Sequence, residues 1–351
     1  MRMYRRQMTW VIAAAWLVAL TCPASALAVN ATFESATSTV TVTADEADLG
    51  NGFAQVVLKQ RADHALLVNG QKVVDVSTGL IASADSLASI DVNLSVRSSL
   101  DLKNARFLLR GGNEIKLSFE YPPVRASDTN GSDLNIRLPG TEPAHIIGTG
   151  STLDLNGDGD PDVTLGQPAI SLLTLSTGAG NDTVDLTKLT TLAIRKLPAA
   201  LAMRVNLGAG NDTFRGSSAP EEVYGEAGAD HLFGNGGDDW LVGDDGNDTI
   251  WGGPGRDGIA GANGNDLIHG GPGADMVGGG RGSDHVWGDA GNDIVGGGPD
   301  KDWLYGGTGS DEIYNDHTSE HVINCGPGDD LIKIVWPGSR SCERAEFKQN
   351  Q

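Results

Sequence analysis

Apolar and polar positions repeat every nine residues over the C-terminal part of this 351-residue chain. One register runs from Leu207 to Tyr314, which is twelve consecutive units. The first position is glycine in eleven of the twelve units, the sixth is acidic in all of them, and the eighth is always apolar. The eighth-position residues are Phe214, Val223, Leu232, Leu241, Ile250, Ile259, Ile268, Val277, Val286, Val295, Leu304 and Ile313.

A nine-residue unit with one inward apolar side chain is too short for a helix and must stack on its neighbours to bury that side chain. We expect a six-residue turn, in which glycine supplies positive φ, followed by a three-residue strand. Two units make one coil, so same-side turns recur every 18 residues and strands stack about 4.8 Å apart. The pattern predicts an all-β chain whose residues 207–333 form a parallel β-roll.

The sixth-position acids then fall into two columns, one along each edge of the roll. One column contains Asp212, Asp230, Asp248, Asp266, Asp284 and Asp302, and the other contains Glu221, Asp239, Asp257, Asp275, Asp293 and Asp311. Carboxylates at this spacing repel one another unless cations lie between them. Ca²⁺ takes about 6–8 oxygen ligands, which Asp carboxylates and the carbonyls of glycine-rich turns can supply. We therefore expect several calcium ions between neighbouring turns. A flexible Gly/Asp-rich linker would not keep twelve acids and twelve aliphatic residues in phase.

Residues 270–277, Gly-Gly-Pro-Gly-Ala-Asp-Met-Val, resemble the nonapeptide of RTX, or haemolysin-type, calcium-binding proteins. The resemblance covers about a third of the chain and implies a right-handed parallel β-roll with calcium in its turns. Two further matching turns, at 178–182 and 326–330, add Asp182 and Asp330 to the expected ligands. The pattern is broken by Glu221, which replaces Asp, and by Ala219 and Asp300, which replace glycine.

A second kind of calcium signal lies upstream of the repeats. Oxygen-bearing side chains follow one another at Asp154, Asn156, Asp158, Asp160 and Asp162, with Gly159 for the sharp turn, as in the first part of an EF-hand loop. The position of the usual last ligand is occupied by a leucine and the flanks read as strand. We therefore favour a calcium loop of the kind found in β-proteins over a bare acidic turn.

The ninth position of alternate units carries rings spaced 18 residues apart. These residues are Phe233, Trp251, His269, Trp287 and Tyr305, whereas the opposite sheet has Val242, Ala260, Gly278 and Gly296. The rings are expected to form one outward column. Two interpretations stay open, namely cross-strand stacking, or a flat platform that binds a glycan, cell wall or protein partner.

The remaining chain divides into four parts. Residues 1–28 have a basic start, a short apolar stretch and a small-residue cleavage site, as in a signal peptide. Residues 29–145 read as a β-rich domain, with an alternating strand at 90–96 and a hairpin turn at Asn69-Gly70. A sandwich and a continuing β-helix both fit this domain. Residues 146–206 form a transition region, and residues 334–351 a C-terminal cap.

Charge and cysteine usage narrow the function classes. Forty-six acidic against 25 basic residues give a net charge of −21, which argues against nucleic acid or an anionic membrane as partner. No stretch after the signal peptide is long and apolar enough for a membrane helix. Cys325 and Cys342 are the even pair left after cleavage, and we expect them to form a disulfide in an oxidising compartment. The product is expected to be secreted.

These features favour an exported calcium-binding protein with a structural, adhesion or surface-interaction role. The alternative is an extracellular enzyme acting on polysaccharide or peptide, with a catalytic domain before the roll. Neither His-Glu-x-x-His nor Gly-x-Ser-x-Gly is present, and a pore-forming role lacks a membrane-inserting segment. His317 to His321 spell an inverted zinc motif, for which a polar turn is the favoured interpretation.

Overall fold

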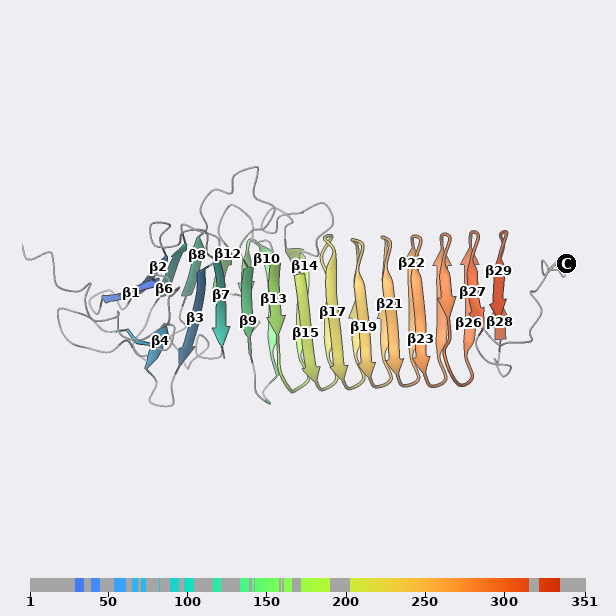
Figure 1. The fold of residues 1–351 in the computed structure, drawn as a ribbon, viewed down its shortest axis with the longest axis horizontal. Helices are drawn as coiled ribbons and strands as arrows, with labels where there is room; N and C mark the ends of the chain where they lie inside the picture. The colour runs from blue at the N-terminus through green and yellow to red at the C-terminus, as the bar shows by residue number, and fades with distance from the viewer. Residues whose placement is uncertain are drawn as a thin grey trace, which may run out of the picture.

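The computed structural model is an elongated β structure in which strands stack side by side along one axis (Figure 1). The described residues are 29–34, 39–44, 54–60, 65–68, 71–73, 82, 89–94, 98–103, 116–120, 133–138, 141, 143–157, 159, 161–165, 172–189, 203–315 and 322–334. Within these ranges every regular element is a strand, and no helix is present that could cross a membrane. The expected all-β class is confirmed.

Two sheets run the length of the roll on opposite sides of one core. In sheet A the roll strands are β14 (Thr183–Leu189), β16 (Thr213–Arg215), β18 (His231–Phe233), β20 (Thr249–Trp251), β22 (Leu267–Pro272), β24 (His285–Ala290), β26 (Trp303–Thr308) and β28 (Val322–Asn324). In sheet B they are β13 (Leu172–Ser176), β15 (Met203–Ala209), β17 (Glu221–Ala227), β19 (Trp240–Asp245), β21 (Gly258–Asn263), β23 (Met276–Arg281), β25 (Ile294–Gly296), β27 (Glu312–Asn315) and β29 (Leu331–Ile334).

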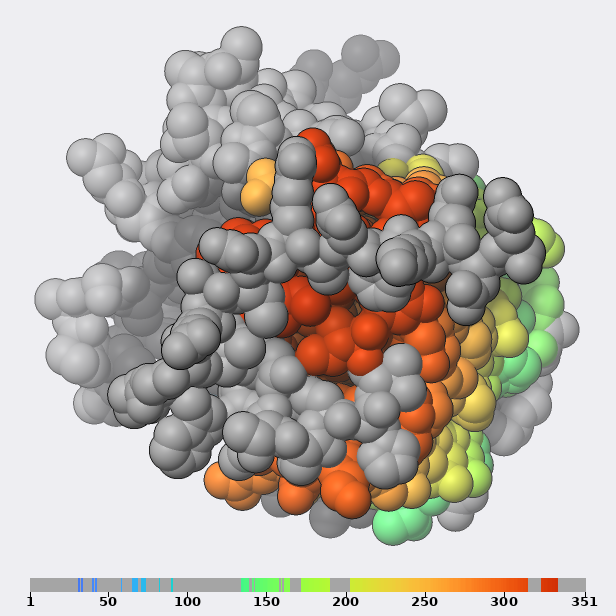
Figure 2. Space-filling view, turned by 90° about the vertical axis from the view of Figure 1, so that its right-hand side faces the viewer, coloured from blue at the N-terminus to red at the C-terminus, as the bar shows by residue number. Residues whose placement is uncertain are grey.

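The chain alternates between the sheets, and every strand of the repeat region pairs in parallel with the strand one coil away. Thr249 pairs with Leu267, Ile250 with Ile268 and Trp251 with His269, a shift of 18 residues. Figure 2, turned by 90° from Figure 1, shows the successive coils lying behind one another. The predicted parallel β-roll with two units per coil is confirmed.

The core contains one aliphatic or aromatic side chain from each unit. All twelve eighth-position residues are buried, with at most 4% of their surface exposed. In β20 the side chains before and after Ile250 are only partly buried, because successive side chains of a strand point to opposite faces. The eighth-position residues therefore form one continuous apolar column in which each coil covers the next.

The strands are longer than the sequence pattern predicts. Six of them, β19, β21, β22, β23, β24 and β26, contain six residues, because the first three positions of the following unit also pair with the next coil. Glycine at position one permits this, since backbone can pack against backbone where no side chain intervenes. The turns on both edges are correspondingly shorter than the expected six residues.

Parallel pairing continues upstream of the repeats. In sheet A, β2 (Thr39–Ala44), β6 (Ser89–Leu94), β8 (Lys116–Glu120) and β12 (Val163–Leu165) pair in parallel. In sheet B, β3 (Ala54–Gln60), β7 (Ser98–Lys103) and β9 (Asp133–Arg137) pair in parallel and reach β13. Of the two interpretations of this domain, the pairing favours the continuing β-helix.

Antiparallel strands interrupt this pattern at a few places. They are the pair β1 (Val29–Glu34) and β2, the hairpin of β4 (Leu66–Val68) and β5 (Gln71–Lys72), and β10 (His145–Gly150) followed by β11 (Thr152–Asp154). The hairpin of β4 and β5 turns at residues 69–70, where Asn-Gly predicted it.

Several sequence predictions fall outside the described residues. They are the signal peptide at 1–28, the inverted zinc motif at His317 to His321, and Cys342. Cys325 is described and is buried with 3% of its surface exposed. The disulfide between Cys325 and Cys342 therefore stays a prediction.

Candidate metal centre

The sixth-position acids stand directly before the strands, at the two edges of the roll. Those before sheet A strands begin with Asp182 and continue with Asp212, Asp230, Asp248, Asp266, Asp284 and Asp302. Those before or at the start of sheet B strands are Glu221, Asp239, Asp257, Asp275, Asp293, Asp311 and Asp330. We call these the A column and the B column. The order is the one that the 18-residue recurrence predicts.

Each column is held by a chain of hydrogen bonds between consecutive coils. The backbone N–H of Asp230 donates to Oδ1 of Asp248 at 2.8 Å, and the N–H of Asp248 donates to Oδ1 of Asp266 at 2.8 Å. The B column repeats the arrangement, with the N–H of Asp257 donating to Oδ1 of Asp275 at 2.8 Å. One oxygen of each of these acceptor carboxylates is therefore committed to backbone.

The other carboxylate oxygen is buried without a hydrogen-bond partner among the described residues. This holds for Oδ2 of Asp182, Asp212, Asp230, Asp239, Asp248, Asp257, Asp266, Asp275, Asp284, Asp293 and Asp311, and for Oε2 of Glu221. These twelve residues have at most 2% of their surface exposed. A buried acceptor without a partner is destabilising, and a repeated series of such atoms indicates a ligand that the protein chain itself does not supply.

Burial also raises the pKa of these carboxyl groups, because desolvation disfavours the charged form more than the backbone hydrogen bonds favour it. The pKa rises to about 7 for Asp230, Asp257, Asp266 and Asp293, and to about 6 for Asp212, Asp275 and Asp284. Neighbouring carboxylates of the same column add to the rise for Asp257 and Asp293. Without a cation, part of each column is therefore protonated at neutral pH.

Glycine at position one keeps a gap open beside each unpartnered oxygen. A Cβ on Gly234 would stand 2.5 Å from both Oδ2 of Asp239 and the carbonyl oxygen of Gly252. A Cβ on Gly252 would stand 2.5 Å from Oδ2 of Asp257 and 2.5 Å from the carbonyl oxygen of Gly270. A carboxylate oxygen and a backbone oxygen from the next coil thus border the same gap.

These donors fit calcium. The described residues contain no group of three or more His, Cys, Asp or Glu side chains placed to hold one metal ion. Each ion would therefore take one carboxylate from a column and most of its remaining ligands from turn carbonyls, which are hard oxygen donors suited to Ca²⁺. Sites built from sulfur or imidazole, as zinc prefers, are not offered by this part of the chain.

The three departures from the repeat pattern lie close together or at single turns. Glu221 keeps its place in the B column, where its N–H donates to Oδ1 of Asp239 at 2.9 Å, while Ser217 donates to Oε1 of Glu221. Burial and the charge of Asp239 raise the pKa of Glu221. Asp300 occupies a glycine position with φ of 97°, a backbone conformation that is strained for a residue with a Cβ. These turns are the least regular of the two columns.

The predicted loop at 154–162 is described except for Asp158 and Asp160. The Asp154 carboxylate accepts from the N–H groups of Asn156, Gly157 and Gly159 at 3.2, 2.6 and 2.8 Å. Oδ2 of Asp162 accepts from the N–H of Leu155 at 2.7 Å. Asp154 and Asp162 therefore brace the loop from its two ends, and calcium binding there stays a proposal.

The five predicted rings stack in one column on the outer face of sheet A. Their centroids are 4.9, 5.9, 4.4 and 5.0 Å apart in the order Phe233, Trp251, His269, Trp287 and Tyr305, with interplanar angles of 1–7°. Because neighbouring rings are nearly parallel, each covers the face of the next and presents mainly its edge to solvent. This geometry favours the stacking interpretation over a flat platform.

Sequence reasoning missed a set of outward residues on sheet B. Arg204, Glu222 and Tyr224 form a polar network on β15 and β17, and Trp240 and Met276 are exposed on β19 and β23. They occupy the seventh or ninth position of their units. The small ninth-position residues of sheet B were visible in the sequence, but the exposed side chains beside them follow no period that would mark them.

A comparison with protein-family models matches this region to the RTX calcium-binding nonapeptide repeat. The matched segments are residues 204–230, 224–259, 251–286, 260–295, 269–302 and 296–314. No curated protein matches the chain. Residues 204–314 of this chain are therefore an array of RTX calcium-binding nonapeptide repeats, folded as a parallel β-roll.

Proposed function

We propose that this chain is an exported protein whose roll folds when it binds several calcium ions outside the cell, and that the folded roll serves a structural or surface-interaction role. The observation that carries the proposal is the pair of columns in which buried carboxylate oxygens lack hydrogen-bond partners. The calcium-binding repeats found by the family comparison support it.

The columns explain why folding would depend on calcium. Stacking the coils brings carboxylates of one column to successive strands about 4.8 Å apart and removes them from water. Part of this penalty can be relieved by protonation, which is why burial raises the pKa of Asp266 to about 7. Calcium relieves it without protonation, and ligand bound only to the folded state stabilises that state in proportion to the logarithm of its concentration.

Export fits the same mechanism. Weak extracellular calcium sites have dissociation constants of about 10⁻⁴–10⁻³ M, so they stay empty at cytoplasmic calcium levels and fill outside the cell. The acidic roll would then remain loosely folded until after translocation. Cleavage after residue 28 and the disulfide between Cys325 and Cys342 belong to this proposal.

The test is a calcium titration of the mature protein, starting from a metal-stripped sample and followed by far-ultraviolet circular dichroism. We expect the β-sheet signal to develop as calcium is added and to disappear when a chelator is added. Magnesium serves as the control, because it requires near-octahedral geometry and retains its water ligands, so it should not replace calcium. Metal analysis of the folded product gives the number of ions.

A complete β-sheet spectrum in the presence of chelator, with no gain in thermal stability on adding calcium, would contradict the proposal. The same measurement on Asp245→Asn checks that the response comes from the columns. Asp245 is exposed in a turn of the same roll, and its replacement should leave the calcium midpoint unchanged.

A further inference from the structure

The outer face of sheet B contains a groove that the repeat pattern does not require. From β19 to β25 the ninth-position residues are small, namely Val242, Ala260, Gly278 and Gly296. On the opposite face of the roll the same position carries the stacked rings. Sheet B is therefore low along its middle, and the strands before and after this stretch carry larger side chains.

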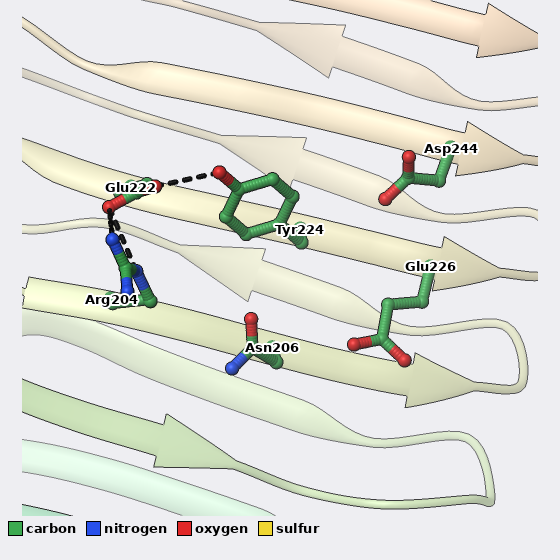
Figure 3. Close-up of a pocket in the computed structure, with 6 residues that line it drawn as sticks. All are labelled: Arg204, Asn206, Glu222, Tyr224, Glu226 and Asp244. Carbon is green, nitrogen blue, oxygen red and sulfur yellow. Dashed lines mark hydrogen bonds and ion pairs between the residues drawn. The ribbon is translucent and has the colours of Figure 1, made fainter.

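Two similar polar clusters border the groove at its ends. Tyr224 on β17 donates its hydroxyl to Glu222 at 2.7 Å, and Arg204 on β15 donates to the same carboxylate at 2.6 Å (Figure 3). At the other end Tyr314 on β27 donates to Glu312 at 2.7 Å, and Lys333 pairs with that carboxylate. Five strand steps separate β17 from β27, so the clusters lie about 24 Å apart.

The hollow between them has two adjoining parts. One has a volume of about 430 Å³ and is lined by Arg204, Asn206, Glu222, Tyr224, Glu226 and Asp244 (Figure 3). The other, of about 620 Å³, shares Glu222 and Tyr224 with the first and extends over Trp240, Arg256, Met276 and Ile294. The two parts give one surface that is polar at the β15 end and mixed along the rest.

Two large apolar side chains are exposed in this groove. Trp240 has 46% and Met276 has 54% of its surface accessible, the highest exposures among the large hydrophobic residues of β19–β25. The edge of the Trp240 indole lies in the space above β21, where a Cβ on Gly258 would stand 2.7 Å from Cζ3. Glycine at 258 thus allows the indole to lie along the groove.

The glycines of the groove floor have no conformational reason to be glycine. Gly278 and Gly296 do not have the positive φ that marks the turn glycines. A Cβ on Gly278 would meet only the carbonyl oxygen of Ile259, at 3.9 Å, and one on Gly296 only Cβ of Tyr314, at 3.8 Å. Glycine weakens a strand interior and often marks a place where a ligand approaches the backbone closely. The floor is therefore kept open although a larger side chain would fit.

The charges of the groove select the kind of ligand. Its lining carboxylates include Glu226, Asp238 and Asp244, whereas Arg204 is already paired with Glu222. The chain as a whole has a net charge of −21. Anionic polysaccharides and a second copy of this chain would be repelled. A long neutral molecule with apolar patches and many hydroxyl groups matches the aromatic, thioether and hydrogen-bonding groups that line the groove.

We propose that the groove on sheet B binds a neutral polysaccharide chain lying along the roll axis, with Trp240 as its main apolar contact. This inference rests on the proposed calcium-dependent folding, since the groove exists only when the coils stack. It assigns polysaccharide binding to sheet B and leaves the ring column of sheet A a stabilising role.

The experiment uses the mature protein in saturating calcium and measures sedimentation with insoluble cellulose and chitin, with polygalacturonate gel as the anionic probe. Gly278→Phe places a ring in the groove, and Trp240→Ala removes the apolar contact. The matched controls are Thr249→Phe and Trp251→Ala, which make the same kinds of change on the outer face of sheet A. Circular dichroism in calcium and in chelator checks that each variant folds like the parent.

We expect the parent protein to bind at least one neutral polysaccharide, and both groove variants to lose at least tenfold in affinity while both controls retain it. Binding of polygalacturonate alone, or of no polysaccharide by a fully folded protein, would overturn the assignment. So would equal losses in Trp251→Ala and Trp240→Ala. A protein that fails to fold in calcium would instead contradict the proposed folding mechanism, and the two failures are therefore distinguishable.

Discussion

The two oxygens of each column carboxylate have different roles. In Asp266, Oδ1 accepts the backbone N–H of Asp248 at 2.8 Å and so fixes the spacing of two coils, while Oδ2 is buried without a hydrogen-bond partner. The first role is purely structural and would survive replacement by asparagine. The second requires a negative charge and a cation. A single side chain thus joins the stacking of the coils to the binding of metal.

The raised pKa values predict how the stability of the metal-free roll depends on pH. The folded pKa of Asp266 is about 7 and its unfolded value is 3.8, so the folded state holds more protons between these values. Stability of the metal-free form should therefore be highest below pH 4, fall as pH rises from 4 to 7, and level off above 7. Calcium affinity should rise over the same range, because protons compete for the carboxylates.

Urea unfolding of metal-stripped protein at pH 5, 6, 7 and 8 measures this dependence. Asp266→Asn keeps the oxygen that accepts the N–H of Asp248 but removes the charge. We expect it to raise metal-free stability at pH 8 by about 1–2 kcal/mol and to shift the calcium midpoint to higher concentration. A metal-free stability that increases from pH 5 to pH 8 would be inconsistent with this description.

The strands of the roll are short, and their stability comes from cross-strand contacts rather than from their own length. β18 and β20 each contain three residues, yet each places a buried aliphatic side chain inward and a ring outward. On the inner face the apolar column is continuous. On the outer face of sheet A the ring column adds contacts between coils at the same positions.

Removing one ring from the column tests its contribution. Trp287 stacks on His269 at 4.4 Å and on Tyr305 at 5.0 Å, so Trp287→Ala removes two ring pairs. Each pair contributes about 0.5–1.5 kcal/mol, and we expect a loss of about 1–3 kcal/mol in urea unfolding with calcium present. Trp240→Ala, on the opposite face, removes an exposed indole without a stacked partner in this column and should cost less. Equal effects would contradict a stabilising column.

The sequence predicts the repeat region well because each of its positions has one physical role. The twelve inward residues, the two acid columns and the ring order all follow from a period of nine with two units per coil. The longer strands were not predicted, because pairing of first-position glycines depends on backbone contacts that leave no side-chain pattern. The upstream domain was ambiguous for a related reason. Parallel pairing between β7 and β9 spans about 35 residues without a repeating sequence signal.

Since every coil contacts only its neighbours, the roll behaves as a linear array in which stability is a sum over coils and their interfaces. Both edges carry the same kind of turn, and both sheets contribute the same kind of inward residue. The inner core therefore does not distinguish sheet A from sheet B. Only the outer faces do, through the ring column on one side and the groove on the other.

This distinction predicts different outcomes for two deletions. Deleting residues 252–269 removes one whole coil, including Asp257 and Asp266, and restores both outer faces in register. Deleting residues 252–260 removes half a coil, so every later strand moves to the opposite sheet. Both proteins should still fold with calcium, because the buried columns stay continuous, and both should be less stable than the parent.

Circular dichroism separates the two outcomes. In the 18-residue deletion Trp251 becomes the direct neighbour of Trp287, since their separation of 36 residues falls to 18. Two stacked indoles at neighbouring strand spacing should give an exciton-coupled signal that the parent, with His269 between them, lacks. In the nine-residue deletion the two indoles lie on opposite sheets and the signal should be absent. An exciton signal in the shorter deletion, or none in the longer one, would mean that coils are not interchangeable units of 18 residues, and the assignment of the two outer faces would then need a different physical basis.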